Sequence, residues 1–350
     1  MSELRYGGSL HNHTDFSNFR FRDSTISVSK LIDRAIQLGH EVVAITEHET
    51  VASAIKAENY YAKIKKDNPN FKVILGNEIY LVRNGLNAEN FNKDFDKYYH
   101  FILLAKDEIG HRQIRELSSR AWMRSYMAKG LRRAPTYYQD LFDIIGADPG
   151  HVIGSTACLG GALATQLLKF RSSRDLELLN KIKVWCRQLK SVFGEGDFYF
   201  EMQPSFNEEQ IYVNKAILAL SEELDIPYII TNDSHYLRKE DQAIHKAYLN
   251  AQDGDREVDA FYATTYLMSD EEIRQYMFSY LGEENLQKAY KNILNIKEKC
   301  NDFSLKKPFK IPRLTWKEFC PILEPDFWFE RMPYLKNFLE SPYEEDRLLA

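Results

Sequence analysis

Short β-rich runs alternate with amphipathic helical stretches for more than two hundred residues, and this alternation limits the folds that the chain can adopt. In the stretch 27–39, Val28, Leu31 and Ile32 recur at helical spacing before a glycine ends the pattern. A strand followed by a helix, repeated seven times, predicts a parallel α/β architecture. The β-rich runs are residues 7–12, 41–46, 71–78, 100–105, 151–156, 197–202 and 227–233.

Either an open doubly wound sheet or a closed barrel would satisfy this pattern. The first run is not followed by a Gly-rich dinucleotide fingerprint, and the chain contains no P-loop motif. The sequence therefore favours a barrel, whose active site would lie at the C-terminal ends of its strands. From about residue 255 the pattern changes to helical stretches and a Pro-broken segment.

The composition is that of an ordinary soluble globular protein, with 44% hydrophobic and 28% charged residues. No apolar stretch approaches bilayer length and the first residues carry no signal pattern, which predicts a cytoplasmic location without membrane contact. A net charge of −5 argues against a protein that coats nucleic acid, although a local basic patch could still handle one strand end. Four cysteines without paired spacing argue against a disulfide framework.

Side chains that bind metals follow most of the predicted strands. His11 and His13, one residue apart on an extended segment, would point to the same side and could grip one cation. His100 departs from the pattern because it begins the fourth run instead of following it. The remaining candidates at strand ends are Asp23, Glu47, His48, Glu78, Cys158, Asp233 and His235.

Each of these motifs alone has a plainer interpretation. An isolated pair of histidines is more often a polar strand end, Glu78 could cap or pair with a cation, and Cys158 could be a small buried hydrophobe. Together, however, such donors at one end of successive strands predict a multinuclear metal cluster, with Glu78 able to bridge two ions. Paired metals are the usual device for phosphoester cleavage. The glycines after Cys158 would open a helix whose N–H groups suit a phosphate. We interpret His40, His111, His151 and His245 as structural or surface residues.

Six segments of the chain form a recognisable set in this order: "LHNHTDFS", "AITEHET", "VILGNEIYLV", "HFILLAKDEIGHRQIRELSSRA", "GSTACLGGALA" and "PYIITNDSHYLRKEDQAIHKAYL". Together they resemble a PHP domain (polymerase and histidinol phosphatase), and most closely the one that begins the alpha subunit of family C DNA polymerase III. The resemblance covers roughly residues 5 to 315 and implies a distorted (β/α)7 barrel with a trinuclear metal site. It implies as ligands His11, His13, Asp23, His48, Glu78, His100, Cys158, Asp233 and His235.

Of these ligands, we expect His48, Glu78 and Asp233 to be the catalytic ones. The cofactors would be two or three divalent ions, with zinc, manganese and iron the first candidates and magnesium a further one. The chain also departs from the family. Glu47 stands where the family usually has aspartate, and the loop before Asp23 is longer than usual, which makes Asp15 a rival ligand.

The polymerase core that follows this domain in the family is missing from the sequence. We expect a PHP barrel over 5–255, a helical extension and linker over 256–312, and the start of a following region, a truncated polymerase core, over 313–350. The expected partners are a DNA primer–template end and a polymerase core, in cis or in trans, with a sliding clamp as a further candidate.

Three functions compete. The first is a metal-dependent phosphoesterase, specifically a 3′–5′ exonuclease that trims mismatched primer ends, because the full ligand set is present. The second is a metal-stabilised scaffold for a polymerase that does no chemistry. The third, a free-standing phosphatase, is disfavoured by the polymerase-like motifs outside the ligands. Arg124, Arg132 and Arg133 could contact the DNA backbone, although such a basic run is usually a solvated helix face.

Overall fold

The computed structural model describes residues 4–19, 22–128, 130–251, 262–309 and 329–349. The chain divides into two units, Met1–Leu305 and Lys306–Ala350, and each is described by itself. The expected boundaries at residues 255/256 and 312/313 lie outside the described residues. The first unit contains the sheet, its covering helices and the candidate site.

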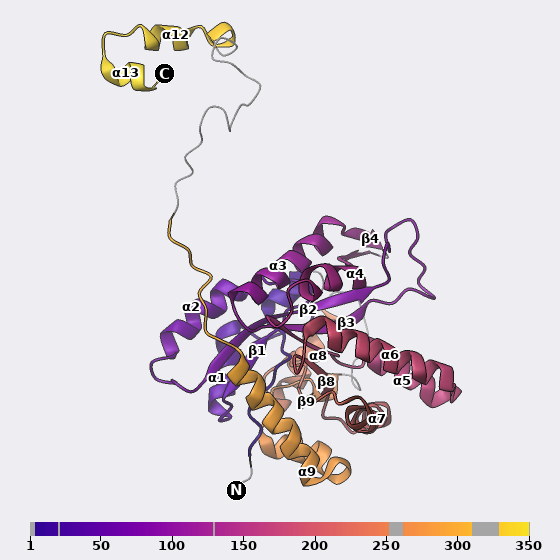
Figure 1. Cartoon of the computed structure of the whole chain (residues 1–350). Coiled ribbons are helices and arrows are strands. Elements are labelled where there is room, and N and C mark those ends of the chain that lie inside the picture. The colour runs from indigo at the N-terminus through magenta and orange to yellow at the C-terminus, as the bar shows by residue number, and fades with distance from the viewer. Residues whose placement is uncertain (1–3, 20–21, 129, 252–261, 310–328, 350) are drawn as a thin grey trace. The chain divides into compact units, whose positions relative to one another are not determined.

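Strands of the first unit form one curled sheet in the order β1-β2-β3-β7-β8-β9, with β6 paired to β2 (Figure 1). Most side chains of these strands are buried, because the strands consist mainly of valine, isoleucine, leucine and phenylalanine, which pack into the core. The strands are β1 Val42–Ile45, β2 Lys72–Val82, β3 Tyr99–Ala105, β6 Thr136–Tyr137, β7 Val152–Ser155, β8 Phe198–Met202 and β9 Tyr228–Ile230. A separate hairpin pairs β4 (Tyr126–Ala128) with β5 (Leu131–Arg133).

The strand β3 runs against its neighbours. It pairs antiparallel with both β2 and β7, whereas β1 with β2, β7 with β8, and β8 with β9 are parallel. The expected parallel strand–helix repeat is therefore wrong at this point. Residues 83–98, all of them described, connect β2 to β3 through turns in place of a helix. An antiparallel neighbour can be reached by a loop, so no crossover helix is needed.

The first predicted strand, 7–12, is not a regular strand but closes the ring of strands. The backbone N–H of Ala44 donates to Ser9 O at 3.1 Å on the β1 side. On the other side, the N–H of His13 donates to Ser234 O at 2.9 Å. Gly8 adopts a φ of +139°, and a Cβ there would lie 1.8 Å from Val42 O. Only glycine fits this close approach, which bends the segment into its place beside β1.

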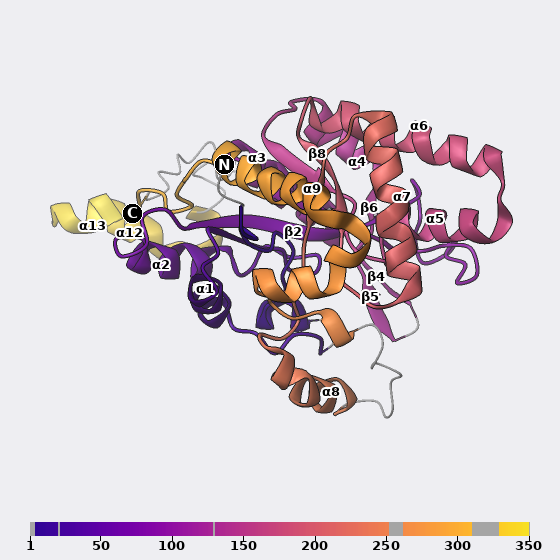
Figure 2. The same cartoon turned by 90° about the horizontal axis from the view of Figure 1, so that it is seen from below.

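The helices cover the outside of the sheet, with α1 and α2 beside β1 and β2, and α6 and α7 beside β8 (Figures 1 and 2). The amphipathic α1 buries its apolar stripe, including Leu31 and Ile32, as its spacing predicts. Helix bounds are α1 Val28–Gln37, α2 Ala54–Ile64, α3 Glu108–Met123, α4 Tyr138–Leu141, α5 Ala162–Ser173, α6 Leu176–Phe193, α7 Glu208–Leu224 and α8 Gln242–Asn250. Short turns of helix are η1 Asp15–Phe19, η2 Phe142–Gly146, η3 Lys239–Asp241 and η4 Tyr262–Thr264.

The long helix α9, Asp270–Lys299, packs against β9 and is kinked at Gly282, whose φ is +72°. Asn292 Nδ2 donates to Tyr228 O at 2.8 Å, which ties the helix to the strand. The α/β barrel class with a helical C-terminal extension is thus confirmed. The second unit contains α12 (Tyr334–Leu339) and α13 (Glu344–Leu349). Among the described residues, no helix is both long enough and apolar enough to cross a membrane.

Candidate metal centre

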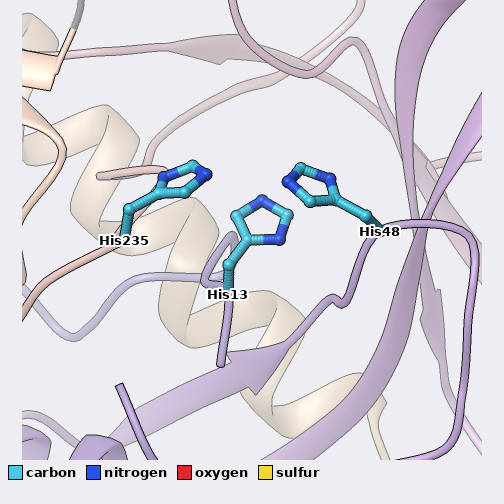
Figure 3. A group of neighbouring side chains, drawn as sticks. All are labelled: His13, His48 and His235. Carbon is cyan, nitrogen blue, oxygen red and sulfur yellow. The ribbon is translucent and has the colours of Figure 1, made fainter. Parts of the chain in front are cut away.

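Three buried histidines from distant parts of the chain turn their ring nitrogens toward one another (Figure 3). His13 lies on the N-terminal segment, His48 follows β1, and His235 follows β9. The ring of His13 lies 3.9 Å from that of His48 and 4.5 Å from that of His235, between centroids. One nitrogen from each ring lies within 4.8 Å of the other two. Three imidazoles in this arrangement can hold one metal ion.

Two further groups of donors adjoin these histidines. In the first, His11 Nε2 and His13 Nε2 lie 3.2 Å and 3.1 Å from Asp233 Oδ1. His13 therefore belongs both to this group and to the group of three histidines. The other group comprises Glu78, His100 and Cys158. His100 Nδ1 lies 2.8 Å from Glu78 Oε1 and 3.4 Å from Cys158 Sγ.

Asp23 lies within the cluster and Asp15 lies outside it. Asp23 Oδ2 is 2.6 Å from His48 Nε2 and 3.1 Å from His235 Nε2. The side chain of Asp15 is 48% exposed and lies 3.8 Å from Lys56 Nζ. The turn η1 points Asp15 outward before the chain returns with Asp23. The structure thus brings all nine side chains expected as ligands into one cluster.

His100 joins the cluster because β3 is reversed. The strands β1, β7 and β9 present the segments that follow their C-terminal ends, and β2 presents Glu78 from within the strand, whereas β3 presents its beginning, where His100 stands. Its ring stacks on Tyr80, the residue opposite it on β2, at 4.8 Å between centroids. A Cβ at Gly160 would lie 3.1 Å from the His100 ring, so the glycine leaves room for the imidazole. The helix α5 begins beyond it at Ala162, and phosphate binding there stays a prediction.

Three loops at the site hold a non-glycine residue in the left-handed region, and in one of them Glu49, the residue after His48, has a φ of +55°. Asp233 has a φ of +50°, and Ala157, the residue before Cys158, has a φ of +57°. Such conformations are unfavourable for residues with a Cβ and occur most often at functional sites. At all three places the unusual backbone lies at a residue, or next to a residue, whose side chain belongs to the cluster.

A buried carboxylate that the sequence reasoning missed fixes His11. Glu201 Oε1 accepts a hydrogen bond from His11 Nδ1 at 2.7 Å. The hydroxyls of Ser155 and Thr231 also donate to Glu201, at 2.6 Å and 2.7 Å. This contact leaves His11 Nε2 facing Asp233, as in a carboxylate–histidine–metal arrangement. The sequence did carry a signal, since Glu201 is the one charged residue in the apolar run of β8.

Glu47, which departs from the usual family residue, supports His13 through Ser17. The Ser17 hydroxyl donates to Glu47 Oε2 at 2.5 Å and lies 3.1 Å from His13 Nδ1. Glu47 also accepts from the backbone N–H of Thr14 at 2.9 Å. If His13 Nδ1–H donates to the serine oxygen, the lone pair of His13 Nε2 is left for a metal.

Charges in the cluster depend strongly on one another. Burial, together with the neighbouring His48 and His235, lowers the pKa of His13 to about 3. Burial opposes the charged form of His48, but the carboxylates of Glu78 and Asp23 raise its pKa to about 10. Burial also opposes ionisation of Asp233, yet the nearby histidines hold its pKa well below the usual range. Buried carboxylates here remain ionised only beside positive charge.

The donor set fits divalent metal ions. Glu78 Oε1 and Asp233 Oδ1 are buried and have no hydrogen-bond partner in the described part of the chain, although imidazole nitrogens lie within 3.2 Å of each. Unpaired buried carboxylate oxygens are unfavourable, and a cation between them and the imidazoles would remove that penalty. Nitrogen, oxygen and one sulfur donor suit zinc, manganese or iron. The groups of histidine, aspartate and glutamate can therefore bind metal.

The three arginines predicted to contact DNA lie in and before the β4–β5 hairpin. Arg124 donates two hydrogen bonds to the Asp140 carboxylate, at 2.6 Å and 3.0 Å, and lies over the Tyr137 ring. Arg132 donates to Ser125 Oγ at 3.2 Å, and Arg133 lies over the Tyr98 ring. Arg124 therefore already has an intramolecular partner. DNA contact by these residues stays a prediction.

Comparisons with known proteins agree on one family. The model of the PHP domain matches residues 9–205. A DNA-directed DNA polymerase of Bacillus phage SPbeta is 38% identical over 355 residues, which cover 97% of this chain and 27% of that protein. The DNA polymerase III subunit alpha of Borreliella burgdorferi is 29% identical over 307 residues, or 85% of this chain and 24% of that protein. The chain thus spans about a quarter of the length of these relatives.

A solved structure from Bifidobacterium adolescentis, named as an inferred metal-dependent phosphoesterase, is 14% identical. It covers 77% of this chain and 94% of its own, with a TM-score of 0.39.

Proposed function

Because the chain belongs to the PHP domain family, we propose that it is the metal-dependent phosphoesterase region of a DNA polymerase of the DNA polymerase III alpha type. The matching relatives are named as DNA polymerases, and the chain corresponds to about a quarter of their length. Polymerisation would then require a core, in cis or in trans, that these residues do not supply. A sliding clamp stays a predicted partner.

Within that role we propose a 3′–5′ exonuclease that removes mismatched nucleotides from a primer end. The observation that carries the proposal is the gathering of nine side chains of metal-binding types, in which the oxygens Glu78 Oε1 and Asp233 Oδ1 accept no hydrogen bond from the described residues. A site that no longer had a function would be expected to lose some of these donors. Divalent ions bound here would activate water for attack on a phosphodiester and neutralise the charge that develops on it.

The protein's own residues would hold and orient these ions. His11, His13 and Asp233 would bind one, while His48 and His235, with Asp23 close to both, would complete a second position. Glu78, His100 and Cys158 would form the third. Glu201 and Ser17 each keep one imidazole in the tautomer whose Nε2 lone pair faces the site.

One observation favours the alternative of a metal-stabilised scaffold that does no chemistry. The side chains of His11, His13 and Glu78 are fully buried, as ligands of a structural metal often are. The side chain of His100 is 27% exposed, however, so the third donor group borders solvent. A phosphate could reach the cluster from this side.

The test is shortening of a 3′-mismatched primer–template by the purified chain, with and without manganese or zinc. We expect metal-dependent release of nucleotides, reduced at least 100-fold by Asp233→Asn. Asp15→Asn is the matched control, because Asp15 lies outside the cluster, and it should shorten the primer as the unaltered chain does. A sample shown to contain metal that releases nothing would refute the exonuclease and support the scaffold.

A further inference from the structure

A cavity of about 240 Å³ lies beside the metal cluster, between the end of β8, the start of α7 and the turn η4. Two of its lining residues are next in sequence to residues of the cluster, and a third contacts Glu201, which supports the cluster. Asn232 precedes Asp233 and Leu159 follows Cys158. Gln203 Nε2 lies 3.4 Å from Glu201 Oε1, the oxygen that also holds His11. A ligand part in this cavity would thus be next to a phosphate bound at the cluster.

The lining of the cavity is polar but almost uncharged. Of the described residues that line it, only Glu209 carries a charge, and it is negative. Four side chains of the lining are amides, each able to donate and to accept: Gln203, Asn207, Gln210 and Asn232. Without a cation, the cavity is unsuited to a phosphate. It suits a neutral group with several hydrogen-bonding atoms, such as a nucleobase.

The amide of Asn232 has an unused donor. Its Oδ1 accepts from the backbone N–H of Met268 at 3.2 Å, which orients the side chain. Its Nδ2 is buried and has no hydrogen-bond partner among the described residues. A buried amide donor is rarely left unpaired, and because Asn232 lines the cavity, an acceptor on a ligand held there would satisfy this donor.

We propose that this cavity binds the nucleoside whose phosphate is bound at the metal cluster, with the Asn232 amide donating to its base. The inference rests on the proposed function, because it takes the substrate to be a nucleic-acid strand end. It adds the part of the site that distinguishes a nucleotide from other phosphate esters. Substrate selection would then depend on neutral amides in place of a basic groove.

Calorimetric titration of the metal-loaded chain tests the proposal without requiring cleavage. Deoxyadenosine 5′-monophosphate should bind at least tenfold more tightly than inorganic phosphate. Ser205→Trp, which fills the cavity from the β8 side, should weaken nucleotide binding at least tenfold. Thr264→Tyr fills it from the η4 side and gives a second variant, should the first not fold. Glu208→Trp, 88% exposed and outside the lining, is the matched control and should bind as the unaltered chain does.

Two results would overturn the proposal. One is nucleotide binding no tighter than phosphate binding; the other is a folded cavity-filling variant that binds the nucleotide as tightly as the unaltered chain. Failure of the exonuclease proposal alone would give a different set of results. In that case the nucleotide binds through the cavity, as the variants reveal, while the primer–template is never shortened.

Discussion

At the scale of single residues, the cluster depends on partners that are not themselves expected to bind metal. Glu201 fixes the Nδ1 side of His11, Ser17 fixes that of His13, and the backbone oxygen of Asp233 lies 2.8 Å from His235 Nδ1. In each case one ring nitrogen is engaged and the other faces the cluster. The histidines are therefore positioned before any ion binds, which lowers the entropy lost on binding.

Replacing Glu201 by glutamine should weaken metal binding about 10- to 100-fold, the usual effect of losing such a supporting carboxylate. The glutamine side chain would lack the charge that holds the His11 N–H. Its NH2 group would also face the hydroxyls of Ser155 and Thr231, which both donate to Glu201 in the present structure. Competition with a chromogenic chelator measures the affinity. Glu222→Gln, on an exposed position of α7, is the control. Equal affinity of the two variants would contradict a supporting role for Glu201.

Stability should fall in acid through His40, which is remote from the cluster. Burial lowers the pKa of His40 to about 4, with Arg34 adding to the effect, although a hydrogen bond to Met268 O opposes it. The other ring nitrogen, Nδ1, has no hydrogen-bond partner in the described structure, and Tyr6 packs edge-on against the ring. A proton at Nδ1 would therefore place an unpaired charge in the interior.

Because the unfolded histidine has a pKa near 6.5, the unfolded chain binds this proton more readily between pH 6.5 and 4. Stability from this group is present above that window and is lost as the pH falls through it. At pH 4.5 we expect a loss of about 2 kcal/mol relative to pH 7. Urea unfolding of the metal-free protein measures it, beside His40→Gln, which keeps a donor for Met268. The same pH dependence in both proteins would rule out this role.

At the scale of elements, the sequence predicts which strands and helices exist better than how they run. The runs 41–46, 100–105 and 197–202 became β1, β3 and β8 with bounds that differ by one residue. Side-chain periodicity does not depend on strand direction, so nothing in "HFILLA" distinguished a parallel from an antiparallel strand. The position of His100 was the visible exception, and the reversal of β3 accounts for it.

The candidate site was predictable where donors stand directly at strand ends, and less so in loops. His48 follows β1, whereas Glu78, expected at the end of its strand, lies inside β2; the two residues form an isolated bridge with each other. Asp15 and Asp23 could not be ranked, because the conformation of η1 decides which of them turns inward. Glu201 was missed because its role depends on the strand that lies beside it in space.

Closure of the sheet by the N-terminal segment should be sensitive to Gly8. Gly8→Ala would place a Cβ 1.8 Å from Val42 O on a residue with a φ of +139°. The segment must then shift away from β1, and we expect a loss of more than about 2 kcal/mol in the free energy of unfolding. Urea denaturation measures it. Gly146→Ala is the control, since its nearest described neighbour would be 3.7 Å away. A stable Gly8→Ala protein would show that the close approach is not required.

At the scale of the whole molecule, one body holds both the core and the site. The large apolar cluster joins strands from β1 to β9 with α9, all within Met1–Leu305. The donor groups lie at one end of that core. Their residues stand on the N-terminal segment, on the strands β2 and β3, and on the loops that follow β1, β7 and β9. Global stability and metal binding are therefore linked.

Removal of metal by a chelator should lower the melting temperature. An ion present at about 100 times its Kd stabilises the folded chain by about 2.7 kcal/mol. A loss of this size corresponds to about 4 °C in a protein of this length, by extrapolation from domains of up to about 250 residues. Calorimetry with and without chelator, followed by readdition of zinc or manganese, measures the change. Asp233→Asn should respond less than the unaltered chain, whereas an equal response would place the stabilising ion elsewhere.

The way the ring closes has a consequence for synthesis of the protein. His13 N donates to Ser234 O, and Asp23 meets His235, a residue 212 positions later. At a translation rate of about 5–20 residues per second, roughly 10–40 s separate the appearance of these two partners. During that time the nascent chain carries only part of the donor set, and the edge of the N-terminal segment that pairs with Ser234 is still open. Correct metal loading on the ribosome must therefore wait for β9, and early loading would capture an ion in an incomplete site.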